Sequence, residues 1–299
     1  MQAPATPENF QLSATLDRLE QAAGLDRVVT PVSDAVQKAL GPRLVQNALH
    51  GVPLGHAVHP ILVQVPIGAW VSAGVLDVVP RTGPAVPVLI GVGIAAAVPA
   101  AAAGFADWSQ QHPQQKRVGI VHAGLNLLAV ALYAKSLSSR TGSRGVRGRA
   151  WAYAGLATVG VSGFLGGHLS YRSAAGTNHA EPVPHLVTPG WHDIGALDEL
   201  SDGVPQRRDV GEVPVVVLRR GNRVSVLSGR CSHLDGPLWD GEMLQDDDER
   251  PCVQCPWHGS VFRFTDGSVY RGPATAPQHV FDVQVSDGRV RVCLPGADG

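Results

Sequence analysis

Charged side chains are scarce in this sequence. Only 16% of its 299 residues are Asp, Glu, Lys or Arg, whereas ordinary soluble domains carry about 25%. Hydrophobic residues make up 44%, which excludes an intrinsically disordered chain. The formal net charge of −1 excludes a strongly basic protein, so we expect no nucleic-acid partner. The shortage of charge indicates instead that part of the chain lies in a membrane.

Cysteine is also rare, and the four cysteines all lie in the C-terminal part: Cys231, Cys252, Cys255 and Cys293. A small secreted domain held together by disulfides would have more cysteines, spread more evenly. The distribution therefore favours metal ligands or buried thiols. A long apolar core is missing from residues 1–30, which contain Asp17, Glu20 and Asp26, so we expect no secretory signal there.

The small net charge results from two parts of opposite sign. Residues 1–180 contain 13 basic and 7 acidic side chains, a balance of +6, while residues 181–299 contain 11 and 18, a balance of −7. A chain of 299 residues has room for two domains of about 150 residues each. We therefore expect two domains of different chemistry.

The first of these domains contains four apolar stretches, at about 60–80, 84–106, 118–138 and 151–171. Each is close to the roughly 20 residues that a helix needs to cross a bilayer. The stretches are rich in Gly, Ala and Ser, which let helices approach closely in lipid. They predict an all-α transmembrane four-helix domain over 51–172, preceded by a helical segment over 1–50. A helical bundle buried in a soluble protein would carry more charge.

The chain changes character after this domain. Residues 173–190 contain Pro182, Pro184 and Pro189 and are typical of a linker. From 191 to 299, short β-prone runs alternate with turn dipeptides such as Asp266-Gly267 and Asp287-Gly288. This pattern predicts a small all-β domain.

The β-domain contains a metal-binding pattern. A C-x-H motif at Cys231 and His233 is followed by a C-x-x-H motif at Cys255 and His258, each in an expected turn between strands. Two such loops can bring two thiolates and two imidazoles to one site. Zinc uses the same donors, so the four residues by themselves leave zinc and iron–sulfur chemistry open.

The residues around these motifs resemble the Rieske family. The segments CSHLDGPL and CPWHGSVF match its cluster-binding loops, and GPATAP at 272–277 is similar to its proline loop, which covers the cluster. The resemblance spans about 191–296 and implies a [2Fe–2S] cluster. It further implies that Cys231 and Cys255 hold one iron and that His233 and His258 hold the other. Rieske midpoint potentials lie at about −150 to +300 mV.

Departures from the family pattern indicate where the midpoint potential of the cluster lies within this range. Rieske proteins of cytochrome bc complexes carry a disulfide between the loops, at positions that are Gly236 and Trp257 here. Ser260 keeps a hydroxyl that can donate to a cluster sulfur, but Phe262 replaces the usual tyrosine. The resemblance thus implies a potential in the middle or lower part of the range, closer to Rieske ferredoxins. We expect Cys252 and Cys293 to be buried strand thiols.

Three histidines mark the ends of the predicted spans: His59, His122 and His168. With four spans, all three lie in one leaflet. Ionisable residues in membrane spans are costly and commonly functional, although at helix ends they can simply reach the interface. The three are therefore candidate ligands of a haem, a metal ion or a quinone, with Asn126 placed one turn after His122 to orient it.

The membrane part also resembles a four-helix membrane family without an established activity, domain of unknown function 2231. The resemblance covers about 50–175. It rests on short motifs: His59-Pro60, Gly104-Phe105-Ala106-Asp107-Trp108, His122-x-x-x-Asn126 and Gly166-Gly167-x-Leu169-x-Tyr171.

These features predict a membrane-anchored protein that passes single electrons between a redox donor and an acceptor in or near the membrane. A redox sensor and a quinol-oxidising subunit remain alternatives. A complete Rieske oxygenase is disfavoured, because its mononuclear iron needs two His and a carboxylate. Only 41 residues follow His258, and they contain one histidine, His279.

The expected partners are a lipid membrane and redox proteins. The acidic C-terminal part, with its run Asp246 to Glu249, favours partners with a basic docking surface. The basic residues that flank the spans number six on one side and five on the other, which nearly balances the positive-inside rule. Because iron–sulfur clusters are assembled in the cytoplasm, we expect an integral protein of the cell membrane whose Rieske domain is cytoplasmic.

Overall fold

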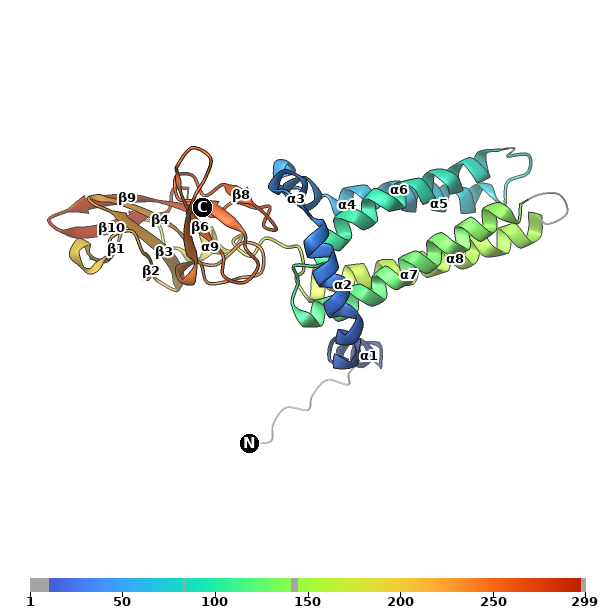
Figure 1. Ribbon diagram of the computed structural model, residues 1–299, viewed down its shortest axis with the longest axis horizontal. Helices are drawn as coiled ribbons and strands as arrows, with labels where there is room; N and C mark the ends of the chain where they lie inside the picture. Colours follow the sequence, from blue (N-terminus) through green and yellow to red (C-terminus); the bar gives the residue numbers. More distant parts are fainter. Residues whose placement is uncertain (1–10, 83, 141–144, 297–299) are drawn as a thin grey trace, which may run out of the picture. The chain divides into compact units, whose positions relative to one another are not determined.

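The computed structural model describes residues 11–82, 84–140 and 145–296, and its contacts divide the chain into two compact units (Figure 1). The helical unit consists of Met1–Leu40 and His59–Ala175, and the β-unit of Gly41–Val58 and Gly176–Gly299. Residues 1–10, 83, 141–144 and 297–299 of the predicted domains lie outside the described residues.

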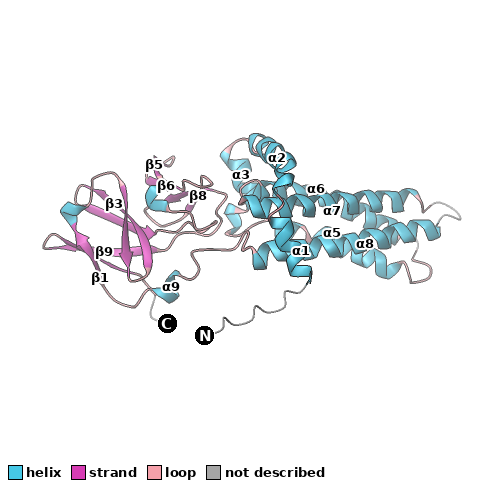
Figure 2. Cartoon of the chain, turned by 90° about the horizontal axis from the view of Figure 1, so that it is seen from below, coloured by secondary structure: helices cyan, strands magenta, loops and turns pink. Residues whose placement is uncertain are grey.

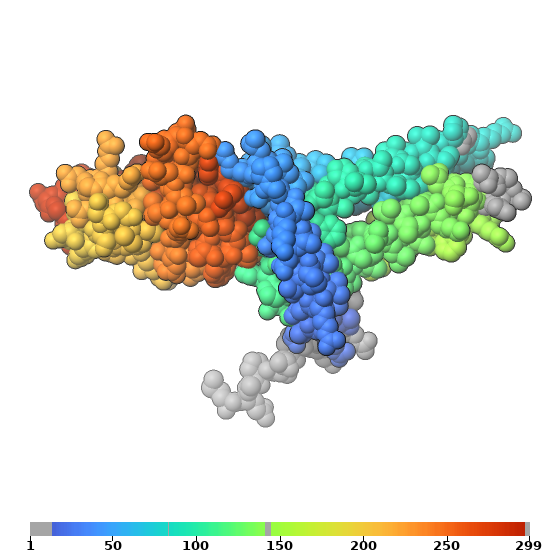
Figure 3. Space-filling view, in the orientation of Figure 1, coloured from blue at the N-terminus to red at the C-terminus, as the bar shows by residue number. Residues whose placement is uncertain are grey.

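The helical unit is built from two pairs of neighbouring helices, α5 with α6 and α7 with α8 (Figure 1). Its long helices are α5 (Gln64–Leu76), α6 (Ala85–Trp108), α7 (Pro113–Ser138) and α8 (Gly145–Gly167). The short α4 (His59–Leu62) leads into α5, and a π-helix over His168–Arg172 follows α8. Helices α1 (Gln11–Glu20) and α2 (Asp26–Ala39) contact α7, and the dark-blue surface of α2 crosses the ends of α6 and α7 (Figure 3).

An aromatic pair at the centre of the unit joins the two helix pairs. The rings of Trp70 on α5 and Tyr133 on α7 are stacked, with their centroids 4.4 Å apart. A Cβ at Gly93 on α6 would lie 2.2 Å from the Trp70 ring, and one at Gly155 on α8 would lie 2.9 Å from the Tyr133 ring. Glycine is therefore required beneath both rings, which explains part of the glycine content of these helices.

The fold class predicted for this part is confirmed, but the number of membrane helices differs. Three segments are long and apolar enough to cross a membrane: His59–Leu76, Ala85–Trp108 and Pro113–Ser138. The fourth predicted span falls on α8, which is not among them within the described residues. Helix α8 begins six residues earlier than the predicted span, and it carries Arg147 and Arg149 in its first turns. These charges and its many small residues lower its apolarity.

The β-unit contains two antiparallel sheets, which confirms the predicted all-β domain (Figure 2). The larger sheet has the order β1-β10-β9-β4-β3-β2 and the smaller has the order β5-β6-β7-β8. The strands of the larger sheet are β1 (His192–Ala196), β2 (Pro205–Val210), β3 (Val213–Arg220), β4 (Arg223–Ser228), β9 (Val280–Ser286) and β10 (Arg289–Cys293). The smaller sheet consists of β5 (Glu242–Gln245), β6 (Pro251–Gln254), β7 (Val261–Arg263) and β8 (Val269–Arg271).

Strand β3 separates two hydrophobic cores because successive side chains of a strand point to opposite faces. Val215 and Val217 belong to the core of the larger sheet. Val216 and Leu218 belong to a second core, which includes Phe262 and two of the cysteines. The smaller sheet is inserted between β4 and β9, so this second core supports the loops that connect the two sheets.

Two short helices complete the β-unit, α3 (Arg43–His50) and α9 (Val183–Leu186). Helix α3 ends at Gly51, whose φ of +88° is in the left-handed region, and a Cβ there would lie 2.2 Å from the His56 carbonyl oxygen. The domain boundaries at 50/51 and 190/191 stay a prediction. The contacts add that Gly41–Val58 groups with the β-unit, although it precedes the apolar helices in the chain.

Candidate functional site

Three loops next to the smaller sheet meet around the predicted cluster ligands. The first, 229–237, follows β4; the second, 255–260, joins β6 to β7; the third, 272–279, joins β8 to β9. The first two close in the same way, because the Cys231 and Cys255 amides donate to carbonyl oxygens five residues later, of Gly236 and Ser260, at 2.8 Å each. Each cysteine thus begins a compact loop that also presents a histidine.

The four donors are arranged in two pairs. The thiols of Cys231 and Cys255 are buried and within hydrogen-bond distance of each other. The half-buried rings of His233 and His258 have centroids 5.1 Å apart and are nearly perpendicular. Within the described ranges, no three His, Cys, Asp or Glu side chains gather around a point that would suit one ion. Two pairs suit a two-iron cluster, whereas a structural zinc ion needs four donors around one centre.

The protonation of the two thiols is coupled. A hydrogen bond from Cys231 lowers the pKa of the Cys255 thiol to about 7, with help from the backbone amides of Trp257 and His258 and against the effect of burial. Burial raises the pKa of Cys231 well above its usual range. Cys255 is therefore the thiol that ionises first, and both must lose their protons to bind iron.

Gly236 and Trp257 lie side by side, as the comparison with disulfide-containing Rieske proteins predicts. A Cβ at Gly236 would lie 2.7 Å from the Cys255 sulfur and 3.3 Å from the Trp257 ring. Trp257 is 48% exposed, so its ring covers Gly236 while its outer part faces solvent. The indole thus occupies the place between the loops where a disulfide could otherwise form.

The third loop is fastened to the two cluster loops by serine hydroxyls. Ser260 accepts a hydrogen bond from the Ala274 amide at 2.9 Å, and Ser232 donates to the Ala276 carbonyl oxygen at 2.7 Å. Because Ser260 is the acceptor in this bond, its donation to a cluster sulfur stays a prediction. Phe262 is fully buried in the same core as the two cysteines and has no such proton.

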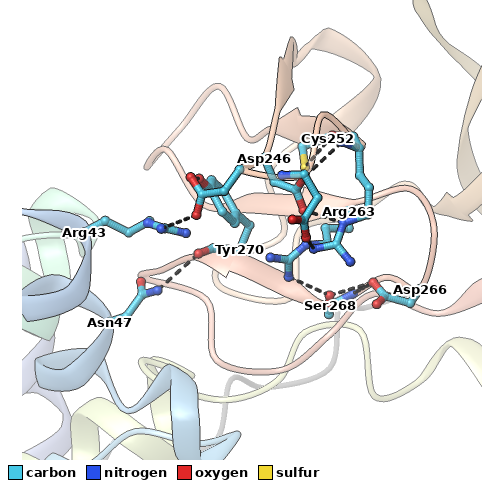
Figure 4. A network of polar contacts seen from close by, with 11 residues as sticks. Arg43, Asn47, Asp246, Cys252, Arg263, Asp266, Ser268 and Tyr270 are labelled. Atoms are coloured by element: carbon cyan, nitrogen blue, oxygen red, sulfur yellow. Dashed lines mark hydrogen bonds and ion pairs between the residues drawn. The ribbon is translucent and has the colours of Figure 1, made fainter.

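The acidic run after β5 is mostly ion-paired within the β-unit (Figure 4). The buried carboxylate of Asp246 lies 2.6 Å from Arg263 and 2.7 Å from Arg250. Burial acts to raise its pKa, but the hydrogen bonds from both arginines hold that pKa well below its usual range. Asp247 pairs with Arg43 and Asp248 pairs with Arg250. The buried Asp246 therefore stabilises the fold, whereas Asp247 and Asp248 form exposed pairs that contribute little to stability.

The remaining cysteines fit the prediction in part. Cys252 on β6 is buried, its thiol donates to the Arg250 carbonyl oxygen, and burial raises its pKa to about 11. Such a thiol is inert. Cys293 at the end of β10 is half-buried rather than buried.

Two of the three membrane histidines occupy equivalent positions in the two helix pairs. His59 Nδ1 lies 2.8 Å from the Ala100 carbonyl oxygen on α6, and His122 Nδ1 lies 2.8 Å from the Ser162 carbonyl oxygen on α8. One turn further along each partner helix is a glycine next to the ring, Gly104 for His59 and Gly166 for His122. Because a carbonyl oxygen can only accept, both rings carry their proton on Nδ1.

Asn126 and His168 are the other two residues predicted to take part in a site in the helical unit. Asn126 donates to His122 Nε2 at 3.0 Å and accepts from the Ser162 hydroxyl, so the expected contact with His122 is present, while its role at a ligand site stays a prediction. His168 differs from the other two, because its Nε2 lies 2.8 Å from a carboxylate oxygen of Glu20 on α1. No sequence motif predicts this pair, whose members are 148 residues apart.

Comparisons with known proteins agree with both parts of the chain. The family model of the Rieske [2Fe–2S] domain matches residues 190–285, and that of a predicted membrane protein family, DUF2231, matches residues 55–179. The anthranilate 1,2-dioxygenase ferredoxin subunit of Burkholderia cepacia is 32% identical over 102 residues, which are 34% of this chain and 90% of that protein. Ferredoxin CarAc of Metapseudomonas resinovorans is 31% identical over 103 residues, 34% of this chain and 92% of that protein.

Among solved structures, the ferredoxin of carbazole 1,9a-dioxygenase from Nocardioides aromaticivorans IC177 is similar, with 29% identity and a TM-score of 0.32. The match covers 35% of this chain and 97% of the ferredoxin. Because the sequence is 32% identical to 90% of the Burkholderia cepacia ferredoxin subunit, the chain belongs to the Rieske family, and its Rieske [2Fe–2S] electron-transfer domain is joined to a domain of the predicted membrane protein family DUF2231.

Proposed function

We propose that this protein is a membrane-anchored electron carrier whose [2Fe–2S] cluster is held by Cys231 and Cys255 on one iron and by His233 and His258 on the other. The arrangement of these donors in a buried thiol pair and a half-buried imidazole pair is the observation that supports it. The cluster supplies one-electron chemistry. The thiols are enclosed by protein, and the imidazoles provide the edge at which electrons enter and leave.

The surface around that edge is where we place the redox partners. Trp257 and Pro256 are exposed next to His258, so a partner can approach the histidine side of the loops. The balance of −7 over residues 181–299 supports a partner with a basic docking surface, although the charge must come largely from outside the paired run at Asp246. We place the β-unit on the cytoplasmic side, where clusters are assembled.

A redox titration of the full chain in detergent tests this function. We expect about two iron atoms per chain, the EPR spectrum of a mixed His and Cys [2Fe–2S] cluster, and a reversible one-electron couple within about −150 to +300 mV. Reduced protein should then pass its electron to a soluble acceptor. Bound zinc without iron, or a couple near −400 mV as in all-cysteine ferredoxins, would contradict the proposal.

The potential itself is testable at Phe262. Replacing Phe262 with tyrosine adds a hydroxyl beside the cluster thiolates, and a hydrogen bond to sulfur stabilises the more negative reduced state. We expect the midpoint potential to rise by roughly 20–60 mV, the equivalent of one net hydrogen bond for a one-electron couple. Phe281→Tyr, in the core of the larger sheet, is the control and should leave the potential unchanged. Equal shifts of the midpoint potential in both variants would show that the missing hydroxyl at residue 262 does not lower the potential.

A quinone or haem site in the helical unit is the second candidate function, and His59 and His122 support it. A histidine that donates from Nδ1 to a backbone carbonyl presents Nε2 as an acceptor or metal ligand. At His122, a ligand would have to displace the amide of Asn126. His168 is less suited, because Glu20 already engages its Nε2. The cluster could then take electrons from a quinol, or report its redox state to the helices as a sensor.

The haem form and the quinone form of this second proposal predict different experimental results. A Soret band in the purified protein would establish haem. Without it, His59→Ala and His122→Ala should abolish cluster reduction by a quinol analogue while the cluster spectrum stays intact. Reduction at the wild-type rate in both variants would remove the quinol proposal and leave the electron carrier unaffected.

A further inference from the structure

Strand β8 leads into the loop over residues 272–279. A side chain from the N-terminal part of the chain forms hydrogen bonds with the outer edge of this strand. Strand β8 is the edge of the smaller sheet, and a strand presents the carbonyl of one residue and the amide of the residue two further on along the same side. Asn47 on α3 bridges these two groups. It donates from Nδ2 to the Tyr270 carbonyl oxygen at 3.1 Å, and its Oδ1 accepts from the Gly272 amide at 3.0 Å.

The contact between α3 and this strand is close. A Cβ at Gly272 would lie 3.2 Å from Val52 and 3.3 Å from the ring of His50, which is buried. At the start of the helix, the Arg43 guanidinium stacks over the Tyr270 ring at 4.2 Å and pairs with Asp247 at 2.6 Å (Figure 4). The Tyr270 hydroxyl donates to the same carboxylate at 2.7 Å. Helix α3 thus contacts β8 at Tyr270 and the adjoining loop at Gly272.

Over residues 272–277, the loop that begins at Gly272 is held by three described side chains that bond to its backbone. Ser260 from the second cluster loop holds Ala274, and Ser232 from the first cluster loop holds Ala276. Asn47 holds the entrance, at Gly272. Two anchors therefore come from the cluster loops themselves, whereas the third comes from a segment 225 residues earlier in the chain.

We propose that Asn47 is a positioning residue of the redox site, which keeps the loop over residues 272–277 closed on the cluster and so limits access of water and small reagents to it. The proposal rests on the cluster ligands given under the proposed function. It assigns a role to a residue outside the segment that matches the Rieske family model.

Asn47→Ala in the full-length protein tests this role against Gln46→Ala. Gln46 is on the same helix but bonds only to the Gly41 carbonyl oxygen. A single net hydrogen bond corresponds to about a fivefold change in a local opening equilibrium. We therefore expect Asn47→Ala to lose its cluster to an iron chelator about fivefold faster or more. In D₂O, pulsed EPR should show stronger deuterium coupling to its reduced cluster. Gln46→Ala should match the wild type in both measurements.

A second variant keeps the test decisive if Asn47→Ala assembles no cluster. Asn47→Asp retains the acceptor for the Gly272 amide and loses the donor to Tyr270, so it should give an effect between those of the wild type and Asn47→Ala. Chelation rates and deuterium couplings equal to the wild type in either Asn47 variant that holds a cluster would overturn the proposal. A wild-type protein that contains no [2Fe–2S] signal would instead overturn the proposed function, so the two failures are distinguishable.

Discussion

Replacing Cys255 with alanine is expected to abolish the iron–sulfur cluster, whereas the same replacement at Cys252, three residues earlier, is expected to leave it in place. The two cysteines form a C-x-x-C pair in the sequence, but the structure gives them different surroundings. Cys255 shares a hydrogen bond with Cys231. Cys252 points to the Arg250 carbonyl oxygen, and its raised pKa keeps it protonated.

Iron content and EPR distinguish the two outcomes. Cys255→Ala should fall from about two iron atoms per chain to nearly none, because each iron of the cluster depends on its own pair of protein ligands. The β-unit of this variant should also unfold at a lower temperature, since binding energy at a metal site contributes to folding. Cys252→Ala should keep its iron and its potential. Loss of the cluster in Cys252→Ala at unchanged folding would show that the ligand assignment is wrong.

Replacing Asp77 with alanine is expected to destabilise the helical unit strongly. The Asp77 carboxylate accepts two hydrogen bonds from the Arg140 guanidinium, at 2.7 and 2.6 Å, and both side chains are largely buried. Arg140 also donates to the Ser136 hydroxyl, which in turn bonds to the Gly148 carbonyl oxygen on α8. One ion pair therefore connects the end of α5 with α7 and α8. Removing one partner of a buried ion pair costs about 3–5 kcal/mol.

Unfolding of the full chain in mixed detergent and SDS micelles measures this loss. The helical unit of Asp77→Ala should unfold at a lower SDS fraction, while the cluster spectrum should stay unchanged. Lys135→Ala, an exposed residue near the same end of α7, serves as the control. The double exchange Asp77→Arg with Arg140→Asp should recover part of the lost stability. A stability loss in Asp77→Ala no larger than that in Lys135→Ala would show that the pair is not important for the fold.

Local patterns in the chain were enough to predict the type of redox site and the fold class. Cysteine and histidine at these spacings predict a metal site however the chain packs, because the donors of each motif are neighbours within one loop. Apolar runs and alternating strands depend on periodicity, which is also local. The predicted number of membrane helices was wrong because the fourth apolar stretch falls on α8, whose many glycines lower its hydropathy even where it carries no charge.

Contacts between residues that are far apart in the chain could be seen only once the chain was folded. The sequence pattern predicts that Asp246 is part of a solvated acidic run, but its buried carboxylate pairs with two arginines. The sequence pattern predicts the same role for His168 as for His59, but His168 contacts the carboxylate of Glu20. Asn47 carries no motif at all, and its role follows from where α3 packs. A hydrogen bond or ion pair of this kind depends on both partners reaching the same place, and no pattern within either segment alone contains that information.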